Sequence, residues 1–295
     1  MFVNGTFEQK QAEDAYIVTG EEGELQVHFL DVGQGDATLI LQGEHAMLID
    51  GGENHKGWQI IDYLKYLGVE RLNYMVGTHP DSDHIGGLDT VLEEIPCDMV
   101  MMPELERDTV SYEGLMEALQ EKGIEPVSPK PGDTYELGTA KITILAPNKT
   151  YENVNDNSIA MRIVHAAKLM CPRHRIISRV GENTFLFTGD AENEAENDML
   201  ISGRLLSSDV YKVAHHGSSG ANSELFLMTV KPEHAVISCG EGNDYGHPHS
   251  EVLNQLRKMG TKVYRTDEQG TIVAISDGNE ITFNVSPTES WQSGR

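Results

Sequence analysis

The stretch "THPDSDHIGG", residues 78–87, follows an apolar run and crowds two histidines and two aspartates into six positions. These residues are His79, Asp81, Asp83 and His84. Neutral imidazole and carboxylate are ligands that zinc and related ions accept, so this composition predicts an open metal site at the end of a strand. The alternative is a polar turn in which Asp83 caps a helix beginning near Ile85. This alternative explains Asp83 but does not explain why His79, Asp81 and His84 are present.

The composition is that of a globular protein. The chain has 295 residues, 39% of them hydrophobic, which is enough for one large domain with a substantial core. There is no apolar run of about 18 residues, so we expect no membrane insertion. The three cysteines have no CxxC spacing, which argues against a disulfide framework and against a thiolate zinc site.

The pattern along the chain predicts a polar leader over residues 1–24, a hydrolase-like domain over 25–285 and a tail over 286–295. The leader lacks the basic start and apolar stretch of a signal peptide. The compartment stays open: cytoplasmic for the sequence as written, or exported or at the cell surface if the N-terminus was trimmed. Nothing in the pattern implies a protein partner.

The formal charge of −25 is the strongest global property. Broad adhesion to nucleic acid or to anionic membranes needs a basic surface, so the charge argues against both. Any polyanionic substrate must then be held by local cations. The segment 165–180 is more basic than the rest and reads as an insertion between strands.

Strand and helix signals alternate, and the same order occurs in two halves. In each half a strand ends in Gly and Asp, a helix follows, and the next strand ends in histidine. The first half has Asp50 of "LIDGG" before His79, and the second has Asp190 of "LFTGD" before His215 and His216. If the strands are parallel, both histidine groups lie at one edge, where open α/β sheets bind ligands.

Several polar residues read as supporting or structural. Asp31 and Asp36 of "DVGQGD" are typical of a turn. Asp50 is expected to orient a ligand from behind rather than to touch metal. Six histidines have no carboxylate neighbour at ligand spacing and are set aside: His28, His45, His55, His165, His174 and His234.

Four motifs, "LIDGG", "THPDSDHIGG", "LFTGDAE" and "VAHHGSSG", together resemble the metallo-β-lactamase fold. More narrowly, "VHFLDVGQGDATLI", "NDNSIAM", "YGHPHSEVL" and "VYRTDEQGTI" resemble the hydrolase-like domain of ComEC-type competence proteins and its stand-alone relatives, including phosphorylcholine esterases. The resemblance runs from about Leu25 to Asp277. It implies an α/β fold built as a four-layer αββα sandwich, with a binuclear metal site on its edge.

The resemblance also implies two divalent ions, with zinc expected first and manganese second. The broad family has a histidine where this chain has Asp81, and an aspartate there is usual in the competence branch. A further family histidine has no evident counterpart, because "NDNS" occupies roughly its place. We assign one ion to His79, Asp81 and either His215 or His216, and the other to Asp83, His84 and His247, with Asp190 bridging. The choices within His215/His216 and His247/His249 stay open.

Such a site implies hydrolysis by a hydroxide that both ions activate. We expect Asp83, His249 and Ser218 to take part in catalysis, with His249 protonating the leaving oxygen. Contacts to substrate are expected from Asn157, Ser158, Ser219, Lys212 and Arg265. The favoured reaction is phosphodiester hydrolysis, on a small ester rather than on bulk DNA because of the negative charge. The alternatives are β-lactam or thioester hydrolysis, di-iron redox chemistry, and a metal-binding module without catalysis.

Overall fold

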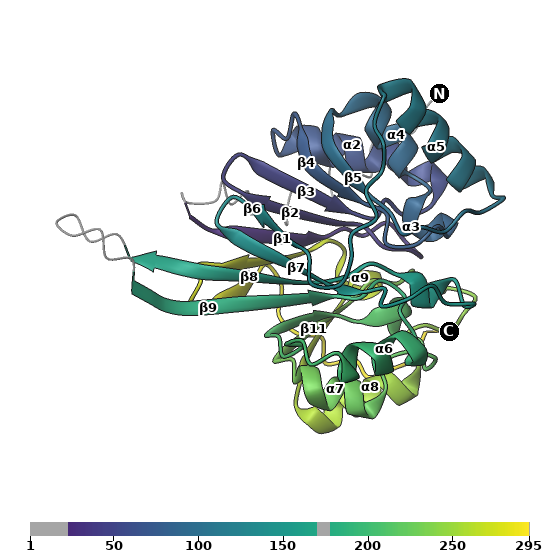
Figure 1. The fold of residues 1–295 in the computed structure, drawn as a ribbon. Helices are drawn as coiled ribbons and strands as arrows, with labels where there is room; N and C mark the ends of the chain where they lie inside the picture. Colours follow the sequence, from purple (N-terminus) through teal and green to yellow (C-terminus); the bar gives the residue numbers. More distant parts are fainter. Residues whose placement is uncertain (1–22, 170–177, 295) are drawn as a thin grey trace, which may run out of the picture.

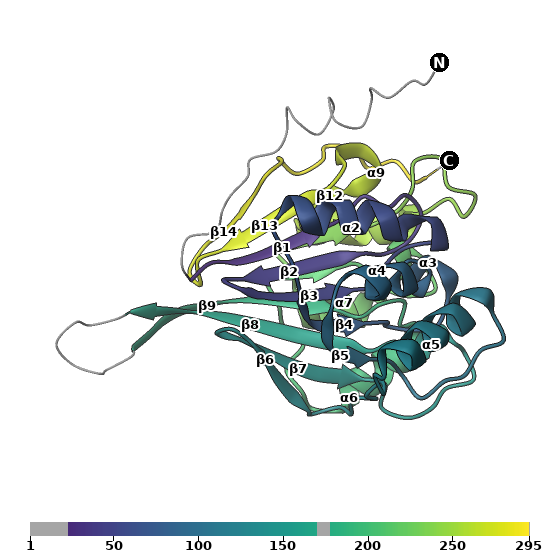
Figure 2. The same ribbon diagram turned by 90° about the horizontal axis from the view of Figure 1, so that it is seen from above.

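The computed structural model describes residues 23–169 and 178–294. Most of the expected leader and the middle of the basic segment lie outside these residues. Within them, two seven-stranded sheets stack face to face, and helices cover both outer faces (Figure 1). The view from above shows the helices α2 and α4 lying over the strands of one sheet (Figure 2). The predicted αββα sandwich is confirmed.

The first sheet has the strand order β14-β13-β1-β2-β3-β4-β5. Its strands are β1 (Leu25–Phe29), β2 (Thr38–Gln42), β3 (His45–Ile49), β4 (Leu72–Val76), β5 (Cys97–Met101), β13 (Ile272–Ser276) and β14 (Ile281–Phe283). The helical elements beside it are η1 (Asn54–Lys56), α2 (Gly57–Tyr66), α3 (Ser82–Ile85), α4 (Leu88–Glu94) and α5 (Val110–Lys122). Strands β3, β4 and β5 are parallel, and helices connect them. Helices cover one face and the second sheet covers the other, which is why these strands are mostly apolar and end in buried residues.

The second sheet has the order β12-β11-β10-β9-β8-β7-β6. Its strands are β6 (Thr134–Leu137), β7 (Ala140–Ala146), β8 (Ala160–Leu169), β9 (Ser178–Phe187), β10 (Val210–Lys212), β11 (His234–Ile237) and β12 (Lys262–Arg265). The helical elements with it are η2 (Asn155–Asn157), α6 (Asn193–Ile201), η3 (Ala214–Gly217), α7 (Glu224–Val230), α8 (Ser250–Met259) and α9 (Thr266–Gln269). The described ends of the basic segment continue β8 and β9, so they belong to strands rather than to an insertion.

Three apolar clusters hold the layers together. The one between the sheets includes the fully buried Phe29 and Phe185. Phe29 also stacks on Phe187 across the sheets, with ring centroids 6.2 Å apart. Burying an aromatic or aliphatic side chain of this size contributes roughly 1.5–3 kcal/mol. The other two clusters lie between each sheet and its own helices, which explains the one-sided apolar faces of α2 and α8.

Parallel pairing in both halves brings the polar strand ends to one edge. Ile49 of β3 pairs with Val76 of β4, and Phe187 of β9 pairs with Lys212 of β10. The predicted repeat is therefore real, and the loops that follow these strands share one edge of the sandwich. In Figure 1 this edge carries α3 and lies opposite the β8–β9 hairpin.

The tail packs on the body of the domain as far as it is described. The Thr288 amide donates to the Val263 carbonyl of β12 at 2.8 Å, and Trp291 packs against the core cluster under the second sheet. None of the described helices is long and apolar enough to span a membrane.

Candidate metal centre

The loop after β4 presents its ligand-type residues through close backbone packing. A Cβ on Gly87 would lie 2.4 Å from the Gly51 carbonyl oxygen, so only glycine permits this approach of the two loops. Asp81 occupies the N-cap position of α3 without a capping hydrogen bond from its side chain to any described residue. Asp83, which the capping alternative named, lies inside α3 and not at a helix N-cap, so that alternative is wrong.

The loop after β10 is held in an unusual conformation. His215 and His216 have φ values of 49° and 53°, in the left-handed region that residues other than glycine rarely adopt. Such strain costs of order 1–3 kcal/mol and persists where the surrounding structure imposes it. Here it turns two successive imidazoles toward the same edge, where their ring centroids lie 6.1 Å apart.

Five predicted ligands converge between the two sheets. His84 Nε2 lies 3.2 Å from Asp190 Oδ1, and His216 Nε2 lies 3.1 Å from Asp83 Oδ2. Three groups each bring three ligand atoms within 4.8 Å of one another, and two of them consist of predicted ligands alone: His79, His84 and Asp190, and Asp83, His84 and His216. The third is Asp36, Asp50 and His84. Asp190 is the most central carboxylate, because its Oδ2 is also 3.6 Å from Nε2 of both His215 and His216.

The donor atoms fit divalent metal. Among the described residues, the buried atoms His79 Nε2, His84 Nε2, Asp190 Oδ1 and His247 Nδ1 have no hydrogen-bond partner. Buried polar groups are almost always satisfied, so several unsatisfied groups at one point need an explanation. Imidazole nitrogens and carboxylate oxygens are also the ligands that zinc prefers.

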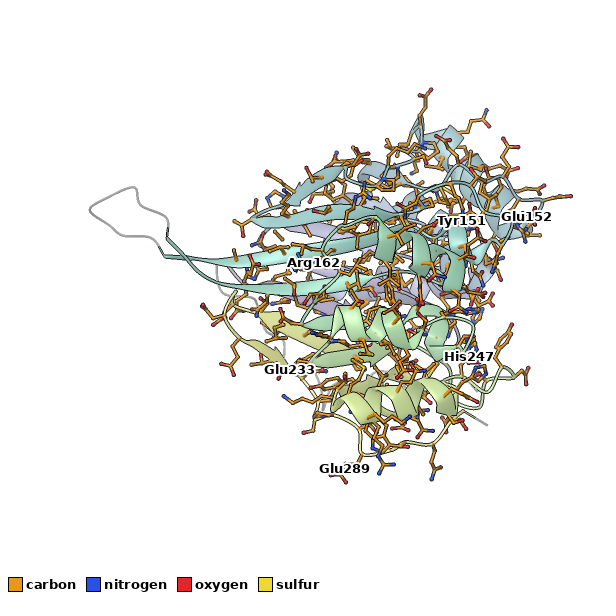
Figure 3. All side chains as sticks on the ribbon, turned by 60° about the horizontal axis from the view of Figure 1, so that its bottom comes forward. Tyr151, Glu152, Arg162, Glu233, His247 and Glu289 are labelled. Atoms are coloured by element: carbon orange, nitrogen blue, oxygen red, sulfur yellow. The ribbon has the colours of Figure 1, made fainter. Side chains whose placement is uncertain are left out.

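Three further predicted ligands border this cluster at longer distances. Asp81 Oδ2 is 3.8 Å from His79 Nε2, as expected if the two share an ion. His216 lies beside Asp83, on the side assigned to the other ion, so His215 is the better candidate for the His79 side. The His247 ring lies 6.0 Å from that of His216 and is 4% exposed. Figure 3 places His247 at the end of the molecule away from the β8–β9 hairpin.

Charges at the centre shift the pKa values of its side chains strongly. Burial would lower the pKa of His84, yet nearby carboxylates, Asp190 foremost, raise it well above its usual value. The pKa of His216 is raised to about 10 against the same effect of burial, again by Asp190 first. Burial would raise the pKa of Asp190, but His84 and His216 hold it well below its ordinary range. The carboxylates thus draw positive charge to this edge, as a metal centre requires.

A family model described as the metallo-beta-lactamase superfamily matches residues 30–241. The chain belongs to the metallo-beta-lactamase superfamily. ComE operon protein 3 of Bacillus subtilis is 28% identical over 290 residues, which are 92% of this chain and 35% of that protein. Recombination protein 2 of Haemophilus influenzae is 30% identical over 252 residues, 84% of this chain and 28% of that protein. The chain thus spans about a third of the length of these relatives.

These relatives confirm the predicted resemblance to competence-type proteins. Among solved structures, the metallo-beta-lactamase fold protein YhfI from Bacillus subtilis superimposes with a TM-score of 0.51 at 13% identity, covering 88% of this chain and 99% of that one. That likeness concerns the fold alone. Superfamily membership and the ligand clusters agree on one candidate site for divalent metal.

Two carboxylates support the imidazoles of this metallo-beta-lactamase superfamily protein from behind. Asp50 Oδ2 lies 2.9 Å from His84 Nδ1 and leaves Nε2 facing the centre, which is the role expected for Asp50. Glu192 Oε1 lies 3.2 Å from His215 Nδ1 and was not predicted. The sequence indicates Glu192 only weakly, because it is simply a glutamate two residues after Asp190 in "GDAE".

Lys212 and Arg265, which we expected to contact substrate, lie in buried ion pairs instead. Lys212 Nζ is 2.8 Å from both carboxylate oxygens of Asp36, and Lys212 is 4% exposed. Arg265 donates from Nε and Nη2 to the two carboxylate oxygens of Asp267 and is 3% exposed. Cations that are enclosed and already neutralised are poorly placed to bind a substrate. The geometry therefore assigns both residues structural roles.

Asn157 and Ser158 lie buried behind the centre. The Asn157 side-chain amide donates to backbone carbonyls of its own loop, 2.7 Å from the nearest. Ser158 Oγ accepts from the Asp190 amide at 3.1 Å and lies 3.4 Å from His79 Nδ1. These contacts position the ligands, whereas the substrate contacts expected of both residues stay predictions.

The rim beyond η3 carries the remaining predicted residues. Ser218 Oγ accepts from the Gly220 amide at 3.2 Å. The Ser219 amide donates to His249 Nδ1 at 2.9 Å, and His249 Nε2 is 3.2 Å from the Tyr245 carbonyl oxygen. Because Nδ1 accepts, neutral His249 carries its proton on Nε2. Its expected role as an acid stays a prediction.

Arg107 is a cation that the sequence reasoning missed. It lies between β5 and α5, its Nη2 is 3.8 Å from Asp81 Oδ1, and its side chain is 38% exposed. Unlike Lys212, it keeps part of its guanidinium open to solvent beside the cluster. The signal was absent because Arg107 sits in a polar loop with no motif around it.

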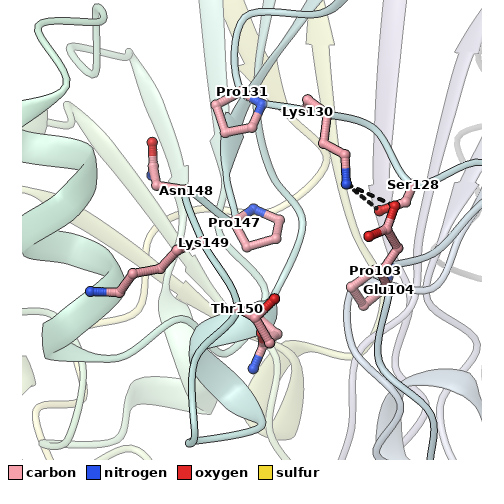
Figure 4. Close-up of a pocket in the computed structure, with 10 residues that line it drawn as sticks. Pro103, Glu104, Ser128, Lys130, Pro131, Pro147, Asn148, Lys149 and Thr150 are labelled. Carbon is pink, nitrogen blue, oxygen red and sulfur yellow. Dashed lines mark hydrogen bonds and ion pairs between the residues drawn. The ribbon is translucent and has the colours of Figure 1, made fainter.

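A cavity of about 350 Å³ lies apart from the ligand cluster. In Figure 4, Lys130 turns toward Glu104 and Ser128 while Lys149 points away from them. Lys149 lies 2.8 Å from Glu194, so neither lysine is a free cation. The cavity is lined by Pro103, Glu104, Ser128, Lys130, Pro131, Pro147, Asn148, Lys149, Thr150 and Asn157.

Proposed function

We propose that the protein is a binuclear metal-dependent phosphodiesterase that acts on a small phosphoester. The observation that carries the proposal is the convergence of imidazole and carboxylate atoms without hydrogen-bond partners at one edge of the sandwich. The residues that would hold two ions are His79, Asp81, Asp83, His84, Asp190, His215, His216 and His247, with Asp190 shared.

Three observations support a phosphoester. One relative is named recombination protein 2, and recombination acts on DNA, a phosphodiester polymer. Arg107 offers a partly exposed guanidinium beside Asp81, and guanidinium groups pair well with phosphate oxygens. The charge of −25 and the enclosure of Lys212 and Arg265 in buried ion pairs favour a small ester over bulk DNA.

Bound divalent ions would supply a nucleophile from water at neutral pH and positive charge beside the attacked group. The protein's own residues complete the site. Asp50 holds the imidazole of His84 in place from behind by a hydrogen bond, and the Glu192 carboxylate lies 3.2 Å behind the His215 ring. Arg107 would bind a nonbridging oxygen of the substrate. His249 would protonate the leaving oxygen in its imidazolium form, because the Nε2 proton of the neutral ring is directed to the Tyr245 carbonyl.

A turnover panel on metal-loaded protein tests the proposal. The substrates are bis-p-nitrophenyl phosphate, p-nitrophenyl phosphorylcholine, single-stranded DNA and nitrocefin. We expect turnover of the two small esters, weaker cleavage of DNA, and no turnover of nitrocefin. Hydrolysis of nitrocefin without hydrolysis of either ester would assign the site to β-lactam chemistry. Metal binding without any turnover would favour a binding module.

A further inference from the structure

Lys212 and Asp36 form an ion pair that joins the two sheets directly behind the candidate metal centre. Lys212 ends β10 of the second sheet, and Asp36 lies in the loop before β2 of the first. Both residues are 4% exposed, and Lys212 Nζ is 2.8 Å from each Asp36 carboxylate oxygen. The desolvation penalty of burying two charges offsets much of the attraction between them, so the ion pair is not explained by a contribution to stability alone.

On the side of the first sheet, Asp36 is tied to the loop that carries Asp83. The Asp36 amide donates to the Asp83 carbonyl at 3.0 Å, and the Gly52 amide donates to the Asp36 carbonyl at 2.8 Å. A Cβ on Gly35 would lie 2.5 Å from the Asp83 carbonyl oxygen, so the two loops are in close contact. Asp36 is more than the turn residue that its motif indicated, because its carboxylate reaches the other sheet.

On the side of the second sheet, Lys212 is tied to the segment that carries His216. Lys212 Nζ also donates to the Val213 carbonyl at 3.2 Å. His216 Nδ1 lies 3.0 Å from the Ser238 carbonyl oxygen and 3.4 Å from Asp36 Oδ1. Asp36 thus contacts both Asp83 and His216, whose ligand atoms are 3.1 Å apart across the two sheets, and Lys212 holds the Asp36 carboxylate in place.

We propose that Lys212 and Asp36 are positioning residues that set the distance between Asp83 and His216 and thereby the affinity for the ion between them. The proposal rests on the metal centre of the proposed function. It concerns the ion between Asp83 and His216, because Asp36 contacts these two residues directly, through the Asp83 carbonyl and the His216 ring. Changes behind a metal ligand typically weaken metal binding ~10- to 100-fold.

The test uses the double variant Asp36→Asn/Lys212→Met, which removes both buried charges and keeps similar side-chain volumes. Arg265→Met/Asp267→Asn is the matched control, since it removes another buried ion pair outside the ligand cluster. The measurements are thermal unfolding of the chelated proteins, and zinc affinity of each site by competition with a chromophoric chelator. Asp36→Glu serves as a second variant that keeps the charges but lengthens the connection.

We expect the Asp36/Lys212 double variant to stay folded and to bind one ion ~10- to 100-fold more weakly while the other ion is retained. The control should bind both ions as the wild type does. Wild-type affinity for both ions in the double variant overturns the proposal, and if that variant does not fold, the same result with Asp36→Glu overturns it. A wild-type protein that binds two ions but hydrolyses no ester contradicts only the proposed function. One that binds no metal contradicts both.

Discussion

Replacing Asp50 with asparagine should impair metal binding by changing the tautomer of His84. Asp50 is 1% exposed and accepts three hydrogen bonds, from the Thr78 amide at 2.8 Å, from Thr78 Oγ1 at 2.8 Å and from His84 Nδ1 at 2.9 Å. The Thr78 amide always donates, so an asparagine must offer it Oδ1. The side-chain NH2 then faces His84 Nδ1, which can only accept, and the proton of the neutral ring moves to Nε2.

Nε2 is the atom that faces Asp190 at 3.2 Å, so its lone pair would no longer be available to metal. In the wild type, the charge-assisted hydrogen bond to Asp50 keeps the proton on Nδ1 and leaves Nε2 free for metal. The variant lacks this bond, which is worth about 1.5–3 kcal/mol and corresponds to roughly a 10- to 100-fold loss of zinc affinity. The assay is zinc competition with a chromophoric chelator, alongside thermal unfolding of the chelated protein.

Asp209 provides a matched control elsewhere in the fold. Its Oδ2 accepts from the Thr184 amide at 2.8 Å and from Thr184 Oγ1 at 2.7 Å, the same two kinds of donor that Thr78 offers to Asp50, but without a histidine ring. Asp209→Asn should therefore affect stability and leave zinc affinity unchanged. If Asp50→Asn binds zinc as tightly as the wild type, the tautomer argument is refuted.

Four further predictions follow from single side chains. Asp190→Ala should lower the metal content from about two ions per chain to less than one, because the Asp190 carboxylate borders both groups of ligands. Elemental analysis measures the metal content, and an unchanged content would exclude a bridging role for Asp190. His249→Ala should slow esters with poor leaving groups by ~10² to 10⁴ in kcat at unchanged metal content, whereas lost metal would make His249 a ligand. Arg107→Met should raise KM for small phosphoesters several-fold, and an unchanged KM would exclude its contact with phosphate. Burial lowers the pKa of His28 to about 4 from 6.5, so its neutral form contributes stability that is complete above pH 6.5 and is lost as pH falls toward 4. The loss is about 3 kcal/mol in the free energy of unfolding, measured by urea unfolding of the chelated protein at several pH values. In His28→Gln this pH-dependent loss should disappear. An unchanged pH dependence would show that His28 is not responsible.

The layers and the position of the centre could be predicted because their signals are local. Apolar runs predict strands buried on both faces, and glycine after a helical pattern predicts its end, as at Gly123 after α5. The repeated order of strand, aspartate, helix, strand and histidine predicts parallel pairing, which puts the polar strand ends together. None of these inferences needs the identity of a residue far away in the chain.

The partners of buried charges could not be predicted, because a pairing depends on which loops meet. Asp36 and Lys212 are separated by 176 positions and lie on different sheets. A lysine at the end of a strand reads the same whether its ammonium faces solvent or a buried carboxylate. Lys212 and Arg265 were therefore interpreted as cations for substrate, while Arg107, in a loop without a motif, was not considered.

The two aspartates of the repeat show how one position along a strand decides a role. In "LIDGG" the aspartate precedes the glycines, and Asp50 has φ 59°, which directs its carboxylate back to the Thr78 amide and to the far side of His84. In "LFTGD" the aspartate follows the glycine, its amide is held by Ser158, and its carboxylate faces His84, His215 and His216. Equivalent strands thus deliver one carboxylate behind the imidazoles and one in front of them. The order of Gly and Asp after a strand is therefore a sequence signal for support or ligation, because it decides which side of the neighbouring histidine the carboxylate reaches.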